Sequence, residues 1–207
     1  LNTTLMRETE NHLRDMDTVS SNMNFYNRKT NFMPAVLDFS VTSNEGQIFL
    51  DIIQMTNELD LNASQVNVID MYGHVIRSGT ITKNDTCSAE DEKWLDKAKQ
   101  LRGKKFLSVP YETRKYSAGS SSSGWYLSLY RASLDGQNRV IGGIETVKSC
   151  KVLFRDIASY LSKGSAQAEI FIFDSNGALI YPYDTSGTLK DISQTYYQML
   201  SGTDDGY

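Results

Sequence analysis

The sequence predicts an α+β protein in which a long N-terminal helix precedes two modules, each containing a helix and a β-hairpin. Three observations support this prediction: an unbroken helical pattern at the N-terminus, two similar hairpins at a constant offset, and alternating strands between them. The first module should hold a five-stranded antiparallel sheet, and the second should be incomplete. The expected boundaries are 1–32, 33–148 and 149–207.

The composition is that of an ordinary globular chain. Hydrophobic residues make up 40% and charged residues 22% of the 207 residues, which is sufficient for a substantial core. The net charge of −4 and the lack of a basic run argue against binding to nucleic acid or to an anionic membrane surface. We find no signal peptide and no apolar stretch of membrane-spanning length. The chain begins inside a helical pattern, so we expect it to be part of a longer protein.

The N-terminal helix carries a heptad-like seam, because its apolar positions alternate gaps of four and three residues. The seam consists of Leu5, Thr9, His12, Met16, Val19, Met23 and Tyr26. Thr9 and His12 are poor core residues. We therefore expect the seam to pack against a neighbouring domain rather than to form a strong coiled coil alone.

Three shorter helices are predicted. Two amphipathic helices should span residues 45–59 and 149–162. A third, rich in charge, lies within 88–103, where Ser88 begins a capping box and Gly103 is suited to a helix C-terminus. Its narrow apolar stripe consists of Trp94, Leu95, Ala98 and Leu101.

Two hairpins are predicted, at residues 66–78 and 170–182. Their Asp-x-x-Gly turns pair Asp70 with Asp174 and Gly73 with Gly177, each at an offset of 104 (174 − 70, 177 − 73). The Asp side chain can bond to the turn backbone, and the Gly supplies a left-handed conformation. Two such hairpins, each preceded by an amphipathic helix and followed by a shorter one, indicate a duplicated module.

Three more strands follow the first hairpin, at 106–109, 125–132 and 139–147. With the hairpin they complete the five-stranded antiparallel sheet. We expect the long helices on one side of this sheet and the Trp94 helix on the other. The second module lacks counterparts for most of residues 104–147.

No catalytic or metal-binding motif is visible, so we expect no enzymatic activity from this region, no cofactor and no metal. His12 and His74 are isolated from each other and from both cysteines. Cys87 and Cys150 suit neither a metal site nor a disulfide-rich scaffold. Two unpaired thiols and a single disulfide both remain open.

The order of these elements resembles the double Cache fold, a pair of PAS-like modules on a long N-terminal helix. This fold forms extracellular regions of bacterial sensor histidine kinases and chemoreceptors. The likeness spans nearly the whole chain and rests on the two hairpins, the Trp94 helix, "SVPY" ending at Tyr111 and "RVIGGIETV" before a long helix. The stretch "GGIETVKSCKVLFRDI" is especially similar to sensor kinases of Gram-positive bacteria.

The resemblance implies the ligand-sensing region of a two-component sensor histidine kinase, on the extracellular face of the bacterial cytoplasmic membrane. Residues 33–148 would be its membrane-distal module and 149–207 part of its membrane-proximal module. Contact with the membrane would run only through flanking spans, and the long helix could mediate a homodimer. The alternatives are a chemoreceptor sensor and a secreted adhesion or carbohydrate-binding module, which the 12 tyrosines could suit by stacking on sugars.

The resemblance also implies a ligand site. In amino-acid-binding Cache domains the short helix carries Arg-x-Trp-Tyr, whose Arg holds the ligand carboxylate. The aligned residues here are Glu92, Trp94 and Leu95, so the Arg and the Tyr are lost. Tyr111 matches a family tyrosine, and Glu145 corresponds to the acidic residue that holds an ammonium group. Without the Arg, we expect a neutral or cationic small molecule rather than an α-amino acid.

Alternation along residues 125–132 places three polar-tipped side chains on one face of the sheet. The predicted ligand-binding residues are therefore Trp94, Tyr111, Tyr126, Ser128, Tyr130 and Glu145. Trp94 has two interpretations, as a pocket wall or as an anchor whose burial contributes about 2–3 kcal/mol.

Overall fold

The computed structural model describes residues 2–30, 65–71, 75–77, 93, 96, 99–101, 104–113, 123–163, 169–183 and 194–199. Its helices are α1 (Asn2–Thr30), α5 (Cys150–Leu153) and α6 (Arg155–Lys163). The first six strands are β1 (Gln65–Asp70), β2 (Val75–Arg77), β3 (Lys105–Leu107), β4 (Tyr111–Thr113), β5 (Ser123–Leu134) and β6 (Val140–Ser149). The last two are β7 (Ile172–Phe173) and β8 (Leu179–Tyr181).

The main sheet is antiparallel and follows the order β2-β1-β6-β5-β3, with β4 pairing to β5 outside this path. The five predicted strands are confirmed, and β4 was missed. The long strand β5 accommodates both neighbours in succession, since Leu107 of β3 pairs with Leu129 and Tyr111 of β4 pairs with Tyr126. A three-residue strand directly after Pro110 is too short to show a period, which is why the pattern did not reveal it.

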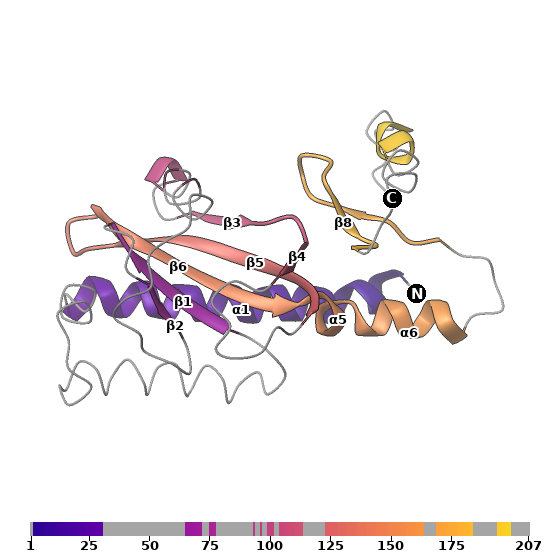
Figure 1. Cartoon of the computed structure of the whole chain (residues 1–207), viewed down its shortest axis with the longest axis horizontal. Coiled ribbons are helices and arrows are strands. Elements are labelled where there is room, and N and C mark those ends of the chain that lie inside the picture. Colours follow the sequence, from indigo (N-terminus) through magenta and orange to yellow (C-terminus); the bar gives the residue numbers. More distant parts are fainter. Residues whose placement is uncertain are drawn as a thin grey trace.

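Helix α1 runs along one face of the main sheet, and a short helical segment near residues 93–101 lies on the other side (Figure 1). The α1 seam faces the sheet, because Thr9, Met16 and Met23 are only 5%, 1% and 1% exposed. The seam therefore packs against the sheet of this chain, and the division of helix and sheet into separate domains stays a prediction. The homodimer through α1 stays a prediction.

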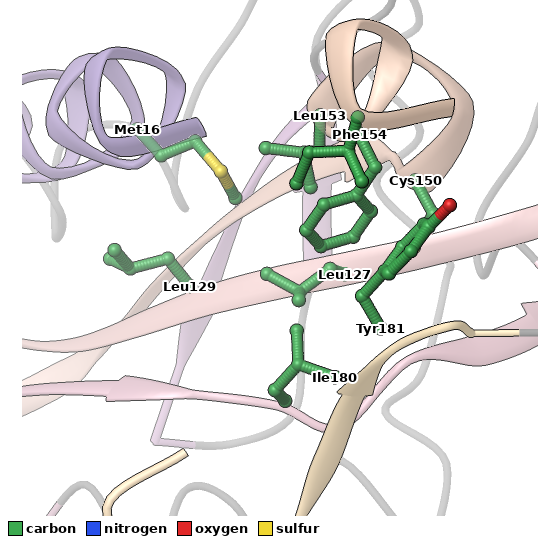
Figure 2. Packing of buried hydrophobic residues seen from close by; sticks show 9 residues of the cluster. Met16, Leu127, Leu129, Cys150, Leu153, Phe154, Ile180 and Tyr181 are labelled. Carbon is green, nitrogen blue, oxygen red and sulfur yellow. The ribbon is translucent and has the colours of Figure 1, made fainter. Parts of the chain in front are cut away.

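One hydrophobic cluster lies between α1, α5, α6 and the sheet, and we call it the helix-side core. It consists of Met16, Leu127, Leu129, Cys150, Leu153, Phe154, Ile157, Ile180 and Tyr181 (Figure 2). The rings of Phe154 and Tyr181 lie 5.1 Å apart, so the β7–β8 hairpin packs directly on the core of the first sheet.

The second hairpin has the turn chemistry that the sequence predicts. Asp174 Oδ1 accepts hydrogen bonds from the backbone N–H groups of Asn176 and Ala178, both at 2.8 Å. Gly177 adopts φ +80°, and an added Cβ would lie 2.5 Å from Cε1 of Tyr197, so this turn requires a glycine. Strands β7 and β8 form their own two-stranded sheet. That the two modules share a fold stays a prediction, as do the boundaries 1–32, 33–148 and 149–207.

The helix predicted at 149–162 is present as α5 and α6, separated at Phe154 (φ −111°, ψ 18°). Cys150 is a free, fully buried thiol, and burial raises its pKa to about 12. The disulfide alternative is therefore not realised at Cys150. Cys87, Gly73, His74 and the helix predicted at 45–59 lie outside the described residues.

Two features are absent from the described ranges. None of their helices combines the length and apolar character needed to cross a membrane. They also contain no group of three His, Cys, Asp or Glu side chains that could hold a metal ion.

Candidate ligand-binding site

The sheet face opposite α1 carries a row of polar and aromatic side chains, and we call it the site face. Glu145 of β6 pairs across the ladder with Asn67 of β1 on one side and with Tyr130 of β5 on the other. Directly opposite residues point to the same face of a sheet. Phe106 of β3 pairs in turn with Tyr130, so this row crosses four strands.

Glu145 is the centre of this face. Its side chain is fully buried, and a buried carboxylate is costly unless it is hydrogen-bonded. Asn67 Nδ2 donates to Oε2 at 2.8 Å, and Ser128 Oγ donates to Oε1 at 2.7 Å. The hydroxyl of Tyr130 also hydrogen-bonds to this carboxylate. Three uncharged groups thus hydrogen-bond to the Glu145 carboxyl group.

The hydrogen bonds continue outward in both directions. Gln65 Nε2 donates to Asn67 Oδ1 at 3.0 Å, and the Tyr111 hydroxyl lies 2.7 Å from Ser128 Oγ. One side-chain network thus runs from β1 through β6 and β5 to β4. The side chains of Gln65, Asn67, Ser128 and Glu145 are at most 2% exposed, so the network belongs to the interior.

Aromatic rings flank the network. Phe106 stacks on Tyr130 with ring centroids 6.0 Å apart, and Tyr111 and Tyr126 lie 6.3 Å apart. Burial, followed by the adjacent Glu145 carboxylate, raises the pKa of Tyr130 far above its usual value of 10.0. Tyr130 therefore remains a neutral hydrogen-bond donor throughout the physiological pH range.

The structure brings together five of the six predicted site residues: Tyr111, Tyr126, Ser128, Tyr130 and Glu145. Trp94 lies outside the described residues, although Lys93 and Asp96 on either side of it are helical. Glu92 and Leu95 lie outside them as well.

Sequence reasoning missed Gln65 and Asn67. A signal was present in "QVNVID", because polar residues at alternate positions interrupt a strand that lies centrally in the sheet. An antiparallel strand with one solvated face alternates in the same way, so the pattern places Gln65 and Asn67 on one face of β1 but does not show that they are buried.

Comparison with solved structures identifies the fold. The periplasmic sensory domain of the Campylobacter jejuni chemoreceptor Tlp1 superposes with a TM-score of 0.60 at 17% identity, covering 98% of this chain and 78% of that one. An extracellular ligand-binding receptor from Desulfohalobium retbaense superposes with a TM-score of 0.59 at 13% identity. The match covers 93% of this chain and 33% of that one. The ligand-binding domain of the Pseudomonas fluorescens chemoreceptor CtaA, in complex with L-isoleucine, superposes with a TM-score of 0.52 at 13% identity. The match covers 99% of this chain and 84% of that one.

The chain therefore has the fold of Cache-type extracellular sensor domains, as the resemblance implied. At these identities the likeness establishes the fold alone. No protein-family model matches the sequence, and no curated protein is significantly similar to it. The chain spans about a third of the Desulfohalobium retbaense receptor.

Proposed function

We propose that this chain is the extracellular ligand-sensing region of a bacterial membrane receptor and that it binds a small molecule on the site face. The observation that carries the proposal is the buried network around Glu145, which joins polar side chains of four strands. Ligand pockets combine aromatic walls with a few convergent polar groups, and the site face has both. The shared fold with extracellular sensor domains supports the same role.

The chemistry of Glu145 indicates the class of ligand. A Glu145 carboxylate that accepts hydrogen bonds from uncharged groups is complementary to a protonated amine or another hydrogen-bond donor. The Tyr111 and Tyr126 rings add surfaces on which a cation can rest. The proposed ligand is therefore a neutral or cationic small molecule.

The proposed output of the receptor is a two-component histidine kinase, in which ligand binding shifts the populations of two arrangements of the sensor. A chemoreceptor is a second candidate, because the sensor domains of Tlp1 and CtaA belong to chemoreceptors. The open reading frame separates the two: two flanking membrane spans with a downstream kinase core support the first. A cleaved leader without a second span would instead support a secreted adhesion module.

Thermal unfolding in the presence of metabolites tests the ligand proposal. A ligand at 100 times its dissociation constant stabilises the fold by about 2.7 kcal/mol, a melting shift of several degrees. Isobutylamine, isobutyramide and isobutyrate form a trio of similar size that separates cationic, neutral and anionic ligands. We expect shifts from amines or neutral molecules and none from the carboxylate.

Variants locate the site. Glu145→Gln and Tyr126→Ala should abolish the shift, whereas Glu112→Gln makes the same chemical change at an exposed position of β4 and should retain it. A ligand whose shift survives both site variants would place the site elsewhere. Stabilisation by α-amino acids would contradict the proposed ligand class.

A further inference from the structure

Asn67 uses both ends of its side-chain amide. Its Oδ1 accepts from Gln65 Nε2 at 3.0 Å, and its Nδ2 donates to Glu145 Oε2 at 2.8 Å. Asn67 is fully buried and Gln65 is 2% exposed. A buried amide in this setting can adopt two orientations that differ by a flip of its oxygen and nitrogen.

Gln65 decides between these orientations. With the Gln65 amide nitrogen pointing at Asn67, only the oxygen of Asn67 can accept that hydrogen bond. The Asn67 nitrogen must then face Glu145, and a nitrogen donor requires an acceptor oxygen opposite it. The two amides together therefore present Glu145 with a donor and disfavour a proton on its Oε2.

On the other side of Glu145, the hydrogen bonds also run from donors toward the carboxyl group. Ser128 Oγ donates to Oε1 at 2.7 Å, and this leaves the Tyr111 hydroxyl to donate to Ser128 at 2.7 Å. The donors of Gln65, Asn67 and Ser128 thus follow one another toward a single carboxyl group. A carboxyl group surrounded by aligned donors is stabilised in its ionised form.

We propose that Asn67, oriented by Gln65, is a positioning residue that holds Glu145 as an ionised acceptor in a fixed orientation, so that the site selects ligands that bring a donor group, such as a protonated amine. This inference rests on the proposed function for its ligand, but the positioning role can be tested on the chain alone. Ladder pairing explains the geometry, because Asn67 lies directly opposite Glu145 in the sheet. Gln65 lies two residues earlier on the same face of β1 and donates to Asn67, which in turn donates to Glu145.

Gln65→Glu tests the orientation. A carboxylate at position 65 cannot donate to Asn67, so the Asn67 amide should flip and present its oxygen to Glu145. Glu145 would then need a proton to make this hydrogen bond. We expect its titration midpoint to rise by at least about one pH unit, a tenfold change in proton affinity. Carbon-13 NMR of the glutamate carboxyl groups in the ligand-free chain measures the midpoint, with Glu145→Gln identifying the resonance.

A double-mutant cycle separates the amide flip from plain charge repulsion. In the Asn67→Leu background there is no amide to flip, so Gln65→Glu should move the Glu145 midpoint much less. An equal shift in both backgrounds would mean that the new charge acts directly, and it would overturn the proposal. Tyr130 of β5 hydrogen-bonds to Glu145, and Tyr111 of β4 reaches it through Ser128, so both tyrosines stay unchanged in the cycle. Lys148 of β6 instead hydrogen-bonds with His12 of α1.

Gln65→Leu is the alternative test variant if Gln65→Glu does not fold, because the leucine adds no charge. Losing the Gln65 donor should release the Asn67 amide, and exchange of its Nδ2 protons should become about tenfold faster. The matched control is Gln137→Leu, at an exposed turn position. Unchanged exchange in Gln65→Leu would overturn the positioning role. Because both measurements use the ligand-free chain, a failure to find any ligand would remove the proposed function and leave this result standing.

Discussion

The two faces of the main sheet use charge differently, although they are formed by alternate residues of the same strands. On the face toward α1, charged side chains of the sheet pair with side chains of the helix, as Arg131 and Lys105 do with Asp17. On the site face, Glu145 is held by the neutral groups of Asn67, Ser128 and Tyr130. The first arrangement ties two elements together. The second buries a carboxyl group among hydrogen-bonding partners within the sheet, where we propose that a ligand binds.

The contacts on the helix face fix α1 along much of its length. Lys148 Nζ lies 2.7 Å from His12 Nδ1, and Asn24 Oδ1 accepts from the backbone N–H of Leu134 at 2.9 Å. Between them Ser20 Oγ accepts from Arg131 Nε at 3.1 Å. A small shift of α1 would break several of these bonds together. We therefore expect contacts on the helix face to contribute more to the free energy of unfolding than contacts on the site face.

The largest expected effect comes from Leu127→Ala, because Leu127 is fully buried in the helix-side core. Removing its side chain should lower the free energy of unfolding by about 2–5 kcal/mol through lost burial and a residual cavity. Urea denaturation measures this change. Val109→Ala is the control, since Val109 is 52% exposed and should cost no more than about 0.5 kcal/mol. Similar losses in both variants would mean that Leu127 is not part of a tight core.

Ser128→Ala changes the neighbouring residue on the opposite face. It removes the donor to Glu145 Oε1 and the partner of the Tyr111 hydroxyl. Leaving buried polar groups without a partner costs about 1–3 kcal/mol, and we expect a loss in that range by the same measurement. Thr146→Val is a matched control at a buried position of β6, because the Thr146 hydroxyl oxygen makes no hydrogen bond that the substitution could remove. Equal losses in the two variants would contradict a special role for the network.

Asp17→Asn tests the ionic contact of the helix face. Burial alone would raise the pKa of Asp17, but the hydrogen bond from Lys105 and the charge of Arg131 outweigh it, and the pKa lies below 3.8. Asp17 therefore contributes stability above pH 3.8 that is lost as the pH falls through its folded pKa. Because the contact is partly exposed, we expect Asn to cost about 1 kcal/mol at neutral pH.

Urea denaturation at several pH values follows this contribution. The difference between the wild type and Asp17→Asn should vanish in acid, whereas Asp15→Asn, at an exposed position of α1, should show little difference at any pH. A difference that persists at the lowest pH would show that the Asp17 charge is not its cause.

Tyr130→Phe removes the hydroxyl that hydrogen-bonds to Glu145 and Ser128, and we expect it to cost about 1 kcal/mol at neutral pH. The distinctive effect of this substitution is on the pH dependence of stability at alkaline pH. The pKa of Tyr130 is raised above 10.0, so stability is present below that pH and falls as the unfolded tyrosine ionises first. The slope is up to about 1.4 kcal/mol per pH unit, and Tyr130→Phe should remove it. Tyr196→Phe, at a 42% exposed ring, is the control, and an equal change in both variants would refute the assignment.

The sequence by itself determined the elements and the faces of the strands. Side-chain periods of 3.6 and 2 are local properties, so the seam of α1 and the common face of Tyr126, Ser128 and Tyr130 could be predicted. The turn at Asp174 and Gly177 was equally local, since one side chain and one left-handed residue define it.

Only the tertiary structure decided which side chains meet. Asn67 and Glu145 are 78 residues apart, and their hydrogen bond depends on β1 lying beside β6 in one register. A shift of one residue would turn either side chain to the opposite face, and no local pattern specifies that register. The free state of Cys150 and the partners of Asp17 depend in the same way on the packing of distant segments. Local periodicity assigns each residue to a face, whereas the chemistry of the site arises from the pairing of strands.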